Sequence, residues 1–241
     1  MSFVIPEGKE KSTYVRKKFS KIADKYDLFN DLITQGMHRY WKRFLVKKAE
    51  LNEGSGVLDI CCGTGDITQL LKNKVGERGQ VIGLDFSSGM LKVAGARNIN
   101  SGANLLRGDA SVLPLKSCSL DAVTVGYGLR NLIDIEICLK EVLRVLKPGG
   151  RFLSLDMGKV KIPVIKQFFD FYFFSIVPRI GKMIYPGEDM FDYFPQSSVN
   201  FPSQEKLSEM LENVGFTNVR FYSFYFGGNV IHYAQKPDQK D

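Results

Sequence analysis

The sequence predicts an α/β protein with a mostly parallel sheet of seven strands, helices on both faces and a C-terminal antiparallel hairpin. From residue 56 onward, short apolar runs alternate with segments of helical spacing, which is typical of parallel strand–helix–strand units. A glycine-rich turn follows the first run and an acidic residue ends the second, as in nucleotide-binding folds. The last β-rich runs, 217–225 and 229–234, are joined by Gly227 and Gly228, which favours the hairpin.

The individual elements follow from the spacing of apolar residues. Helices are expected over 12–26 and 38–50, and the Asp- and Asn-containing segment 26–34 is expected to join them. Strands are expected at 57–60, 80–85, 104–107, 120–125 and 151–156. Helices between and after them are expected over 67–75, 87–98, 133–146 and 207–214. The turn from Lys147 to Gly150 is expected to stop the helix before it, because proline lacks a donor and glycine permits positive φ.

Residues 160–200 break this rhythm. Six of the seven residues from 168 to 174 are aromatic, and the prolines Pro163, Pro178, Pro186 and Pro195 are expected to bracket short helices. We expect either a lid over an apolar substrate that also meets a membrane surface, or a core-packed helix or dimer interface. The chain is therefore divided into an N-terminal helical cap over the active site, residues 1–50, a main domain of residues 51–236 carrying this lid, and a polar tail, residues 237–241.

The composition narrows the class of protein. With 241 residues, 44% hydrophobic and 24% charged, the chain resembles one globular domain rather than a disordered segment. It lacks an apolar run of about 18 residues, and its N-terminus lacks the pattern of a secretory signal. Four cysteines and two histidines supply neither a disulfide framework nor a zinc site, so we expect no metal and a reducing, cytoplasmic location.

The net charge of +7 is concentrated at the N-terminus. Residues 1–50 hold 12 Lys and Arg against 6 Asp and Glu, which accounts for +6. Such a segment can meet an anionic membrane face, nucleic acid or an acidic ligand, and it can equally consist of solvated helix faces. No recognisable RNA-binding module accompanies it, so nucleic acid is not expected as a partner.

The turn after the first strand carries the first functional motif. Gly63 and Gly65 allow a sharp turn close to a ligand, and Asp85, which ends the second strand, can accept two hydrogen bonds from a ribose. Asp59 and Asp66 flank the turn, where carboxylates oppose a diphosphate but suit a sulfonium or ammonium group. The motif indicates S-adenosylmethionine, with Asp59 or Asp66 near its methionine end. A tight turn without a ligand is the alternative.

Later strand ends add further candidates. Asp109 and Ala110 follow the third strand and are expected near the adenine. The loop 126–131 follows the fourth strand and is expected to face the reacting group, although it can also be an ordinary loop. Its candidate residues are Gly126, Tyr127, Arg130 and Asn131. The segment 26–41 contains His38, whose surroundings can be functional or can simply cap helices.

These motifs resemble the ubiquinone/menaquinone biosynthesis C-methyltransferases, which are class I, Rossmann-like, S-adenosylmethionine-dependent enzymes, over about residues 12–236. The family's first signature is similar to Tyr26, Asp27, Phe29, Asn30, Ile33, Thr34, His38 and Trp41. Its second is similar to the segment 144–150, and the loop 128–131 also fits. This sequence departs from the family at Phe29, Thr34, Cys61 and Gly126, where Met, Ser, Gly and, in some members, a cofactor-binding Ser occur.

The resemblance implies a polyprenyl hydroquinone acceptor that is methylated on a ring carbon. We expect demethylmenaquinol, with a methoxy-polyprenyl benzoquinol as the alternative. The resemblance implies cofactor contacts at Thr64, Asp85, Asp109 and Ala110. Phe86, which follows Asp85, is also expected to bind the cofactor. We further expect peripheral contact with the inner face of the cytoplasmic membrane, and either a homodimer or a quinone-biosynthesis complex.

The expected mechanism depends on removing a phenolic proton, which makes the adjacent ring carbon a better nucleophile toward the activated methyl group. Arg130 would stabilise the phenolate and Asn131 would orient it, while His38, Tyr26 or Tyr127 would take the proton. Three alternative functions are compatible with part of these motifs. They are methylation of another small apolar acceptor, RNA methylation, and a non-catalytic scaffold of the quinone pathway.

Overall fold

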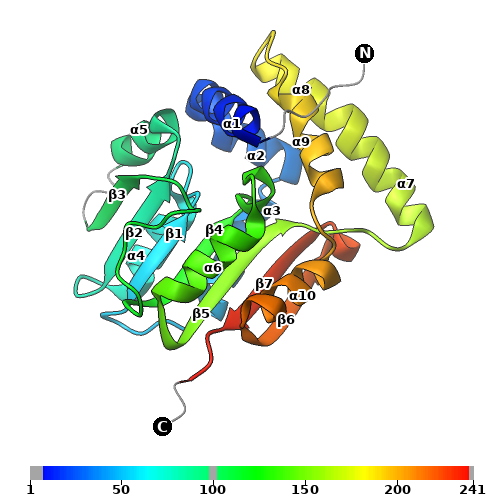
Figure 1. Ribbon diagram of the computed structural model, residues 1–241. Helices are drawn as coiled ribbons and strands as arrows, with labels where there is room; N and C mark the ends of the chain where they lie inside the picture. Colours follow the sequence, from blue (N-terminus) through cyan, green and yellow to red (C-terminus); the bar gives the residue numbers. More distant parts are fainter. Residues whose placement is uncertain (1–7, 98–101, 239–241) are drawn as a thin grey trace.

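The computed structural model describes residues 8–97 and 102–238. A seven-stranded sheet forms its centre, in the order β3-β2-β1-β4-β5-β7-β6 (Figure 1). The strands are β1 (Gly56–Ile60), β2 (Gln80–Asp85), β3 (Ala103–Arg107), β4 (Leu120–Gly126), β5 (Leu146–Met157), β6 (Thr217–Phe224) and β7 (Asn229–Gln235). The expected α/β fold class is confirmed.

The sheet is parallel from β1 to β5 and antiparallel at one edge. β1 pairs with β2 and β4, so Leu58 lies beside both Ile82 and Val123. β7 runs antiparallel between β5 and β6, which confirms the expected hairpin. The chain order reverses between β1 and β4. In open α/β sheets, a crevice for ligands forms at the carboxyl ends of the strands beside such a reversal.

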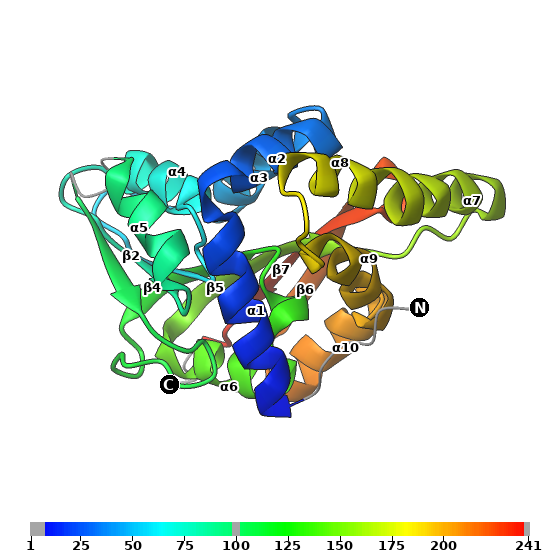
Figure 2. The same ribbon diagram turned by 90° about the horizontal axis from the view of Figure 1, so that it is seen from above.

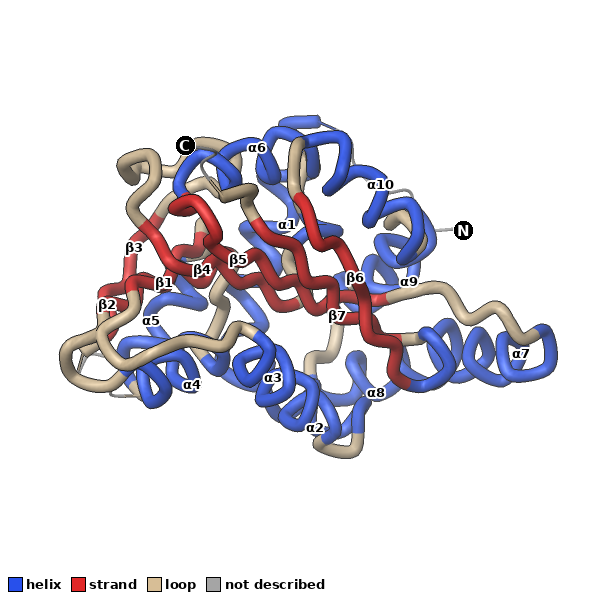
Figure 3. The backbone as a smooth tube through the Cα atoms, turned by 90° about the horizontal axis from the view of Figure 1, so that it is seen from below, coloured by secondary structure: helices blue, strands red, loops and turns tan. Residues whose placement is uncertain are grey.

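Helices cover both faces of the sheet (Figure 3). The helices α3 (Met37–Lys48), α4 (Asp66–Val75) and α5 (Ser88–Ala96) lie on one face, and α6 (Ile135–Val145) and α10 (Gln204–Val214) lie on the other. Leu45 and Leu71 are fully buried on the first face, and Leu139 and Leu211 on the second. Burying each such side chain contributes about 1.5–3 kcal/mol to stability.

A helical cap lies over the carboxyl edge of the sheet (Figure 2). It consists of α1 (Gly8–Ile22), α2 (Tyr26–Thr34), α8 (Val177–Ile184) and α9 (Met190–Asn200). Their apolar faces form a third core cluster around Val15, Phe29 and Phe191, and the rings of Phe29 and Phe191 are centred 4.8 Å apart. The N-terminal segment and the 160–200 segment therefore pack together above the strand ends.

Three local predictions were wrong. The segment 26–34 is a helix, α2, because Phe29 is buried and Tyr26 and Ile33 pack on the same cluster; left-handed backbone at Gln35 and Gly36 ends it. The helix before the segment 147–150 ends where expected, at Val145, and Gly149 has the expected positive φ, but this segment belongs to β5 instead of forming a separate turn. Pro195 stands within α9 rather than at its boundary. The end of the expected helix 87–98 and of the tail 237–241 lie outside the described residues.

The aromatic run spans α7 (Pro163–Phe171) and a π-helical turn, Tyr172–Ile176, that leads into α8. α7 projects away from the rest of the molecule (Figures 1 and 2). Phe168 is 72% exposed and Phe171 is 61% exposed, so much of this run faces outward. Among the residues that the structure describes, none of the helices combines the length and apolar character needed to cross a bilayer.

Candidate active site

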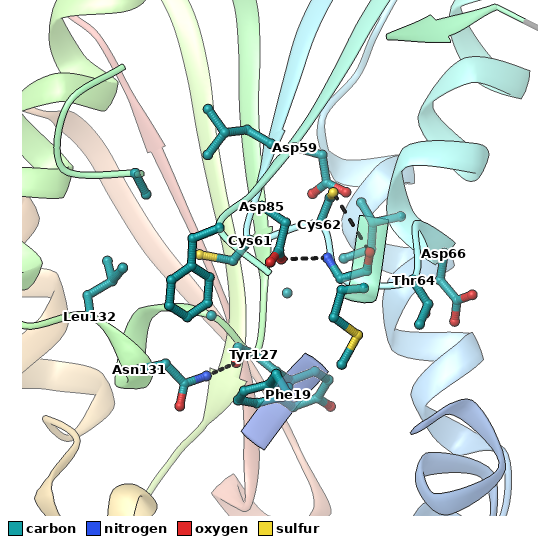
Figure 4. Close-up of a pocket in the computed structure, with 18 of the residues that line it drawn as sticks. Phe19, Asp59, Cys61, Cys62, Thr64, Asp66, Asp85, Tyr127, Asn131 and Leu132 are labelled. Atoms are coloured by element: carbon teal, nitrogen blue, oxygen red, sulfur yellow. Dashed lines mark hydrogen bonds between the residues drawn. The ribbon is translucent and has the colours of Figure 1, made fainter. Parts of the chain in front are cut away.

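The turn between β1 and α4 contains several residues with left-handed backbone. The angle φ is +53° at Cys61, +56° at Gly63 and +86° at Gly65, a region that only glycine adopts freely. A Cβ at Gly63 would meet no other atom within 4 Å, so this backbone borders open space. The Gly63 N–H donates to Oδ2 of Asp85 at 2.9 Å, which ties the turn to the end of β2 (Figure 4).

Asp85 is buried at the end of β2, and its second oxygen, Oδ1, accepts a hydrogen bond from the Ser87 N–H at 2.8 Å. Burial raises the pKa of Asp85, although the surrounding backbone N–H groups oppose the rise. A carboxylate can accept about four hydrogen bonds. Asp85 therefore retains acceptor capacity for the two hydroxyls of a ribose.

Asp59 is held inside the sheet. Its Oδ2 accepts a hydrogen bond from the Thr68 hydroxyl at 2.7 Å, and its Oδ1 accepts one from the Thr124 hydroxyl at 2.8 Å. Burial raises the pKa of Asp59 to about 7 despite these two donors. Both oxygens are thus engaged in fastening β1 to α4 and β4.

Asp66, the first residue of α4, forms ion pairs with two basic side chains. Lys42 Nζ lies 2.7 Å from its Oδ2, and Arg97 Nη1 lies 2.9 Å from its Oδ1. Burial alone would raise the pKa of Asp66, but Lys42 and Arg97 outweigh it and hold this pKa below its ordinary value. Asp27 on α2 also pairs with Arg97 and accepts a hydrogen bond from the Thr64 hydroxyl at 2.8 Å. This network fastens the cap to the glycine turn.

A cavity enclosing about 1110 Å³, part of it open to solvent, lies at these strand ends. The predicted cofactor residues that line it are Asp59, Gly63, Thr64, Asp66, Asp85, Phe86, Asp109, Ala110 and Gly126; Gly65 does not. Phe19 and Tyr26 of the cap close the other side. At Gly126, a Cβ would meet Ile67 Cδ1 at 2.4 Å, so a serine at this position would displace the Ile67 side chain.

The residues of this first cavity fit S-adenosylmethionine. Asp66 and Leu132 lie on opposite sides of Asp85 in Figure 4, so the cavity offers both charged and apolar side chains to a ligand. Asp85 between them suits a ribose, and the apolar side chains of the lining, Phe86 and Met90 among them, suit a base. The open space beside the Gly63 backbone admits the ligand closely.

A second cavity adjoins the first and is mainly apolar; it encloses about 1080 Å³, part of it open to solvent. Four residues line both cavities and form the boundary between them: Tyr26, Asn30, His38 and Tyr127. Aromatic side chains from the cap, α3, α7 and the β6–β7 hairpin build its other walls, namely Trp41, Phe169, Tyr172, Phe173, Phe194 and Tyr225. Part of the aromatic run predicted from the sequence therefore faces a cavity.

Arg130 follows β4 in a 3-10 turn, Leu129–Asn131, and lines the second cavity. Its Nη1 donates to Oδ1 of Asp156 at 2.6 Å, and the two side chains are 5% and 3% exposed. Burial opposes its charge, but Asp156 prevails and raises the pKa of Arg130. The guanidinium therefore stays charged. Its Nε has no hydrogen-bond partner among the described residues.

Asn131 and Tyr127 position each other. The Asn131 amide donates to the Tyr127 carbonyl at 3.2 Å (Figure 4). Its oxygen accepts a hydrogen bond from the Tyr193 hydroxyl at 3.1 Å. The Tyr127 hydroxyl donates to Asn229 at 2.9 Å. Burial raises the pKa of Tyr127 well above its ordinary value, so its phenol stays neutral and is a poor proton acceptor.

His38 lies at the start of α3 with its Nε2 2.8 Å from Oδ1 of Asp31. Arg39 holds the same carboxylate through two hydrogen bonds. Burial first, and then Lys42, lower the pKa of His38 below its ordinary value although Asp31 opposes them. The imidazole is therefore neutral, with Nε2 donating to Asp31. Its Nδ1 is buried and has no partner among the described residues, so it remains an acceptor.

Sequence reasoning gave no role to Lys42, Arg97, Asp156 and Asn229, and it treated Asp27 and Asp31 only as members of the segment 26–34. Among these, Lys42 left a local signal, because it stands four residues before Val46 on the apolar face of α3. The approach of Asp31 to His38 depends on the turn at Gln35 and Gly36, which separates α2 from α3. Within residues 8–97 and 102–238, no group of three or more His, Cys, Asp or Glu side chains could hold a metal ion.

The chain matches known proteins over nearly its whole length. A model of the ubiE/COQ5 methyltransferase family matches residues 7–236. A demethylmenaquinone methyltransferase of Leptospira interrogans is 44% identical over 248 residues, covering 99% of this chain and 98% of that protein. One of Staphylococcus aureus is 38% identical over 237 residues, covering 97% and 98%. The solved structure of a SAM-dependent methyltransferase from Thermotoga maritima shares the fold, with a TM-score of 0.64 at 22% identity, covering 92% of this chain and 99% of that one.

Proposed function

Because the chain belongs to the ubiE/COQ5 methyltransferase family, we propose that it methylates a ring carbon of demethylmenaquinol, with S-adenosylmethionine as the methyl donor. The observation that carries this proposal is the pair of adjoining cavities. One is partly polar and contains Asp85, and the other is aromatic; Tyr26, Asn30, His38 and Tyr127 lie between them. Such a boundary can bring a methyl donor and an apolar acceptor together.

When bound, S-adenosylmethionine supplies a methyl group already activated by its positive sulfur, so the chain itself needs to bind, align and remove a proton. We propose that Asp85 accepts hydrogen bonds from the ribose hydroxyls. Phe86, Asp109 and Ala110, which line the same cavity, would border the adenine, with Thr64 and Asp66 nearer the methionine end. The support is the placement of these residues around the turn between β1 and α4.

The second cavity suits the hydroquinone and the first part of its prenyl tail. The ring would lie at the boundary near His38 and Tyr127, and the tail would extend along Phe169, Tyr172 and Phe173. Each isoprene unit is apolar, and moving it from water to an aromatic cavity is favourable by about 25 cal/mol per Å² of apolar surface buried. This lining supports a polyprenyl acceptor over a small polar one.

We propose that His38 takes a phenolic proton at Nδ1, the ring nitrogen that Asp31 leaves free. Arg130 stabilises the resulting negative oxygen, and Asn131 orients it. The adjacent ring carbon then bonds to the methyl group as the bond from methyl to sulfur breaks. Loss of the ring proton and return of a proton to the oxygen restore the aromatic hydroquinone, so one proton is released in total.

We also propose that α7 rests on an anionic membrane surface. Outward-facing apolar side chains gather along it and the turns beside it: Ile162, Val164, Phe168, Phe171 and Phe174. The same segment, residues 159–184, contains five basic residues and one acid, namely Lys159, Lys161, Lys166, Arg179, Lys182 and Asp170. Lys161 and Lys182 are also paired with Glu205 and Asp192. Exposed apolar side chains together with basic residues are typical of segments that bind the interface of an anionic bilayer. Other residues of the same segment line the second cavity, so a prenyl tail could pass from bilayer to site.

Methyl transfer to defined acceptors tests the proposed function. The purified protein is incubated anaerobically with labelled S-adenosylmethionine and either a reduced demethylnaphthoquinol or a methoxy-polyprenyl benzoquinol. We expect transfer to the naphthoquinol with the higher kcat/KM. Preference for the benzoquinol would move the reaction to ubiquinone synthesis. Binding of S-adenosylmethionine without transfer to either would favour another acceptor or a scaffold.

A further inference from the structure

Lys42 is a buried cation in the first cavity. Its side chain is 10% exposed, and its Nζ lies 2.7 Å from Oδ2 of Asp66. No other Lys or Arg among the described residues lines this cavity, and the lowered pKa of His38 leaves that ring neutral. Lys42 is therefore the one fixed positive charge that the described lining offers to a ligand.

The carboxylate beside Lys42 does not depend on it. Asp66 keeps a second cation, Arg97, on its other oxygen, and Arg97 is itself paired with Asp27. Lys42 has three N–H donors, yet within the described chain Asp66 is its single hydrogen-bond partner. Burying an ammonium group is costly unless its donors are satisfied. The Lys42 ammonium group can therefore bind a further hydrogen-bond acceptor inside the cavity.

The proposed cofactor carries such an acceptor. S-adenosylmethionine ends in an amino-acid group, with an α-carboxylate and an α-ammonium group on the same carbon. A carboxylate pairs strongly with a buried lysine, and an ammonium group pairs with a carboxylate. The Lys42–Asp66 pair presents both charges at the first turn of α4. In Figure 4, Asp66 lies beside Thr64 at the edge of the cavity.

We propose that Lys42 binds the α-carboxylate of S-adenosylmethionine, while Asp66 beside it faces the α-ammonium group. This inference rests on the proposed cofactor and adds a binding residue from α3, outside the glycine turn. It also explains why a lysine occupies the apolar face of α3. Lys42 would thereby link the N-terminal segment to occupancy of the cofactor site.

Calorimetric titration with two ligands tests this assignment. One ligand is S-adenosylmethionine, and the other is its decarboxylated form, which keeps the adenosine, the sulfonium and the amine. Charged hydrogen bonds are each worth about tenfold to a hundredfold in affinity, so wild type is expected to prefer the intact ligand by at least that lower factor. Lys42→Met should lose this preference by weakening only the intact ligand. Lys42→Arg should retain much of it.

Lys47→Met on the exposed face of the same helix is the matched control and should bind both ligands as wild type does. Lys42→Met leaves Asp66 paired with Arg97, so the fold should persist, and thermal melting checks this. Equal weakening of both ligands in Lys42→Met, or no weakening of either, would overturn the assignment to the carboxylate. If wild type bound neither ligand, the proposed cofactor itself would fail.

Discussion

Replacing Arg130 with methionine removes one half of the buried ion pair with Asp156. Because Asp156 is only 3% exposed, its carboxylate would remain buried without its cation. Breaking such a pair costs about 3–5 kcal/mol. For a chain of 241 residues, each kcal/mol lowers Tm by about 2–4 °C, so Arg130→Met is expected to melt about 6–20 °C below wild type. Circular dichroism measures this shift.

The double variant Arg130→Met with Asp156→Leu separates stability from catalysis. Apolar residues of similar size often replace a buried ion pair with little cost, so most of the lost Tm should return. Turnover should stay lower by about a hundredfold or more, because the donor for the phenolate is still missing. If the double variant regained both Tm and turnover, Arg130 would have a structural role only. A single variant that melted like wild type would contradict the burial argument.

Three further predictions concern protonation, the ribose and the membrane. Turnover should fall as the pH drops below 6.5, the ordinary pKa of histidine, because protonation removes the hydrogen-bond acceptor of His38. The His38→Gln variant should lose this fall in turnover at low pH. An unchanged pH profile in the variant would exclude His38 as the base. Asp85→Ala should weaken S-adenosylmethionine binding by at least about tenfold in calorimetry, and unaltered affinity would refute the ribose contact. Phe168→Ser with Phe171→Ser should reduce sedimentation with anionic vesicles. Val112→Ser, at an equally exposed apolar residue far from α7, should not; equal binding by all three proteins would argue against a membrane role for α7.

The main sheet was predictable because its signals are local. Buried parallel strands have the pattern of short apolar runs, and most of them are followed by a helix whose apolar spacing is strong, as at Leu139 and Val142. The prediction for the segment 26–34 was wrong because Asp27, Asn30 and Asp31 are typical of helix caps. Burial of Phe29 against α9 instead stabilises a helix there. Tertiary packing outweighed local propensity there.

The candidate site was predictable only in part, for the same reason. Residues at strand ends, such as Asp85 and Asp109, could be placed because parallel strands end at one edge. Arg97 and Asp156 could not, because their partners lie far away in the sequence: Arg97 pairs with Asp66, and Asp156 with Arg130. The sequence also could not show how the aromatic run divides. Phe168 faces outward, whereas the adjacent Phe169 lines the second cavity. Which of the two side chains faces inward depends on how α7 packs against the rest of the molecule.

The position of the transferred methyl group tests the central claim, that a methyl donor in one cavity meets a ring carbon of a hydroquinone in the next. The protein would be incubated with S-adenosylmethionine carrying a ¹³C methyl group and with reduced demethylnaphthoquinol, and the product would be examined by NMR. The account predicts ¹³C on the ring carbon beside a hydroxyl group, with both oxygens free of label. Label on an oxygen, or no labelled quinol at all while the cofactor binds, would contradict it.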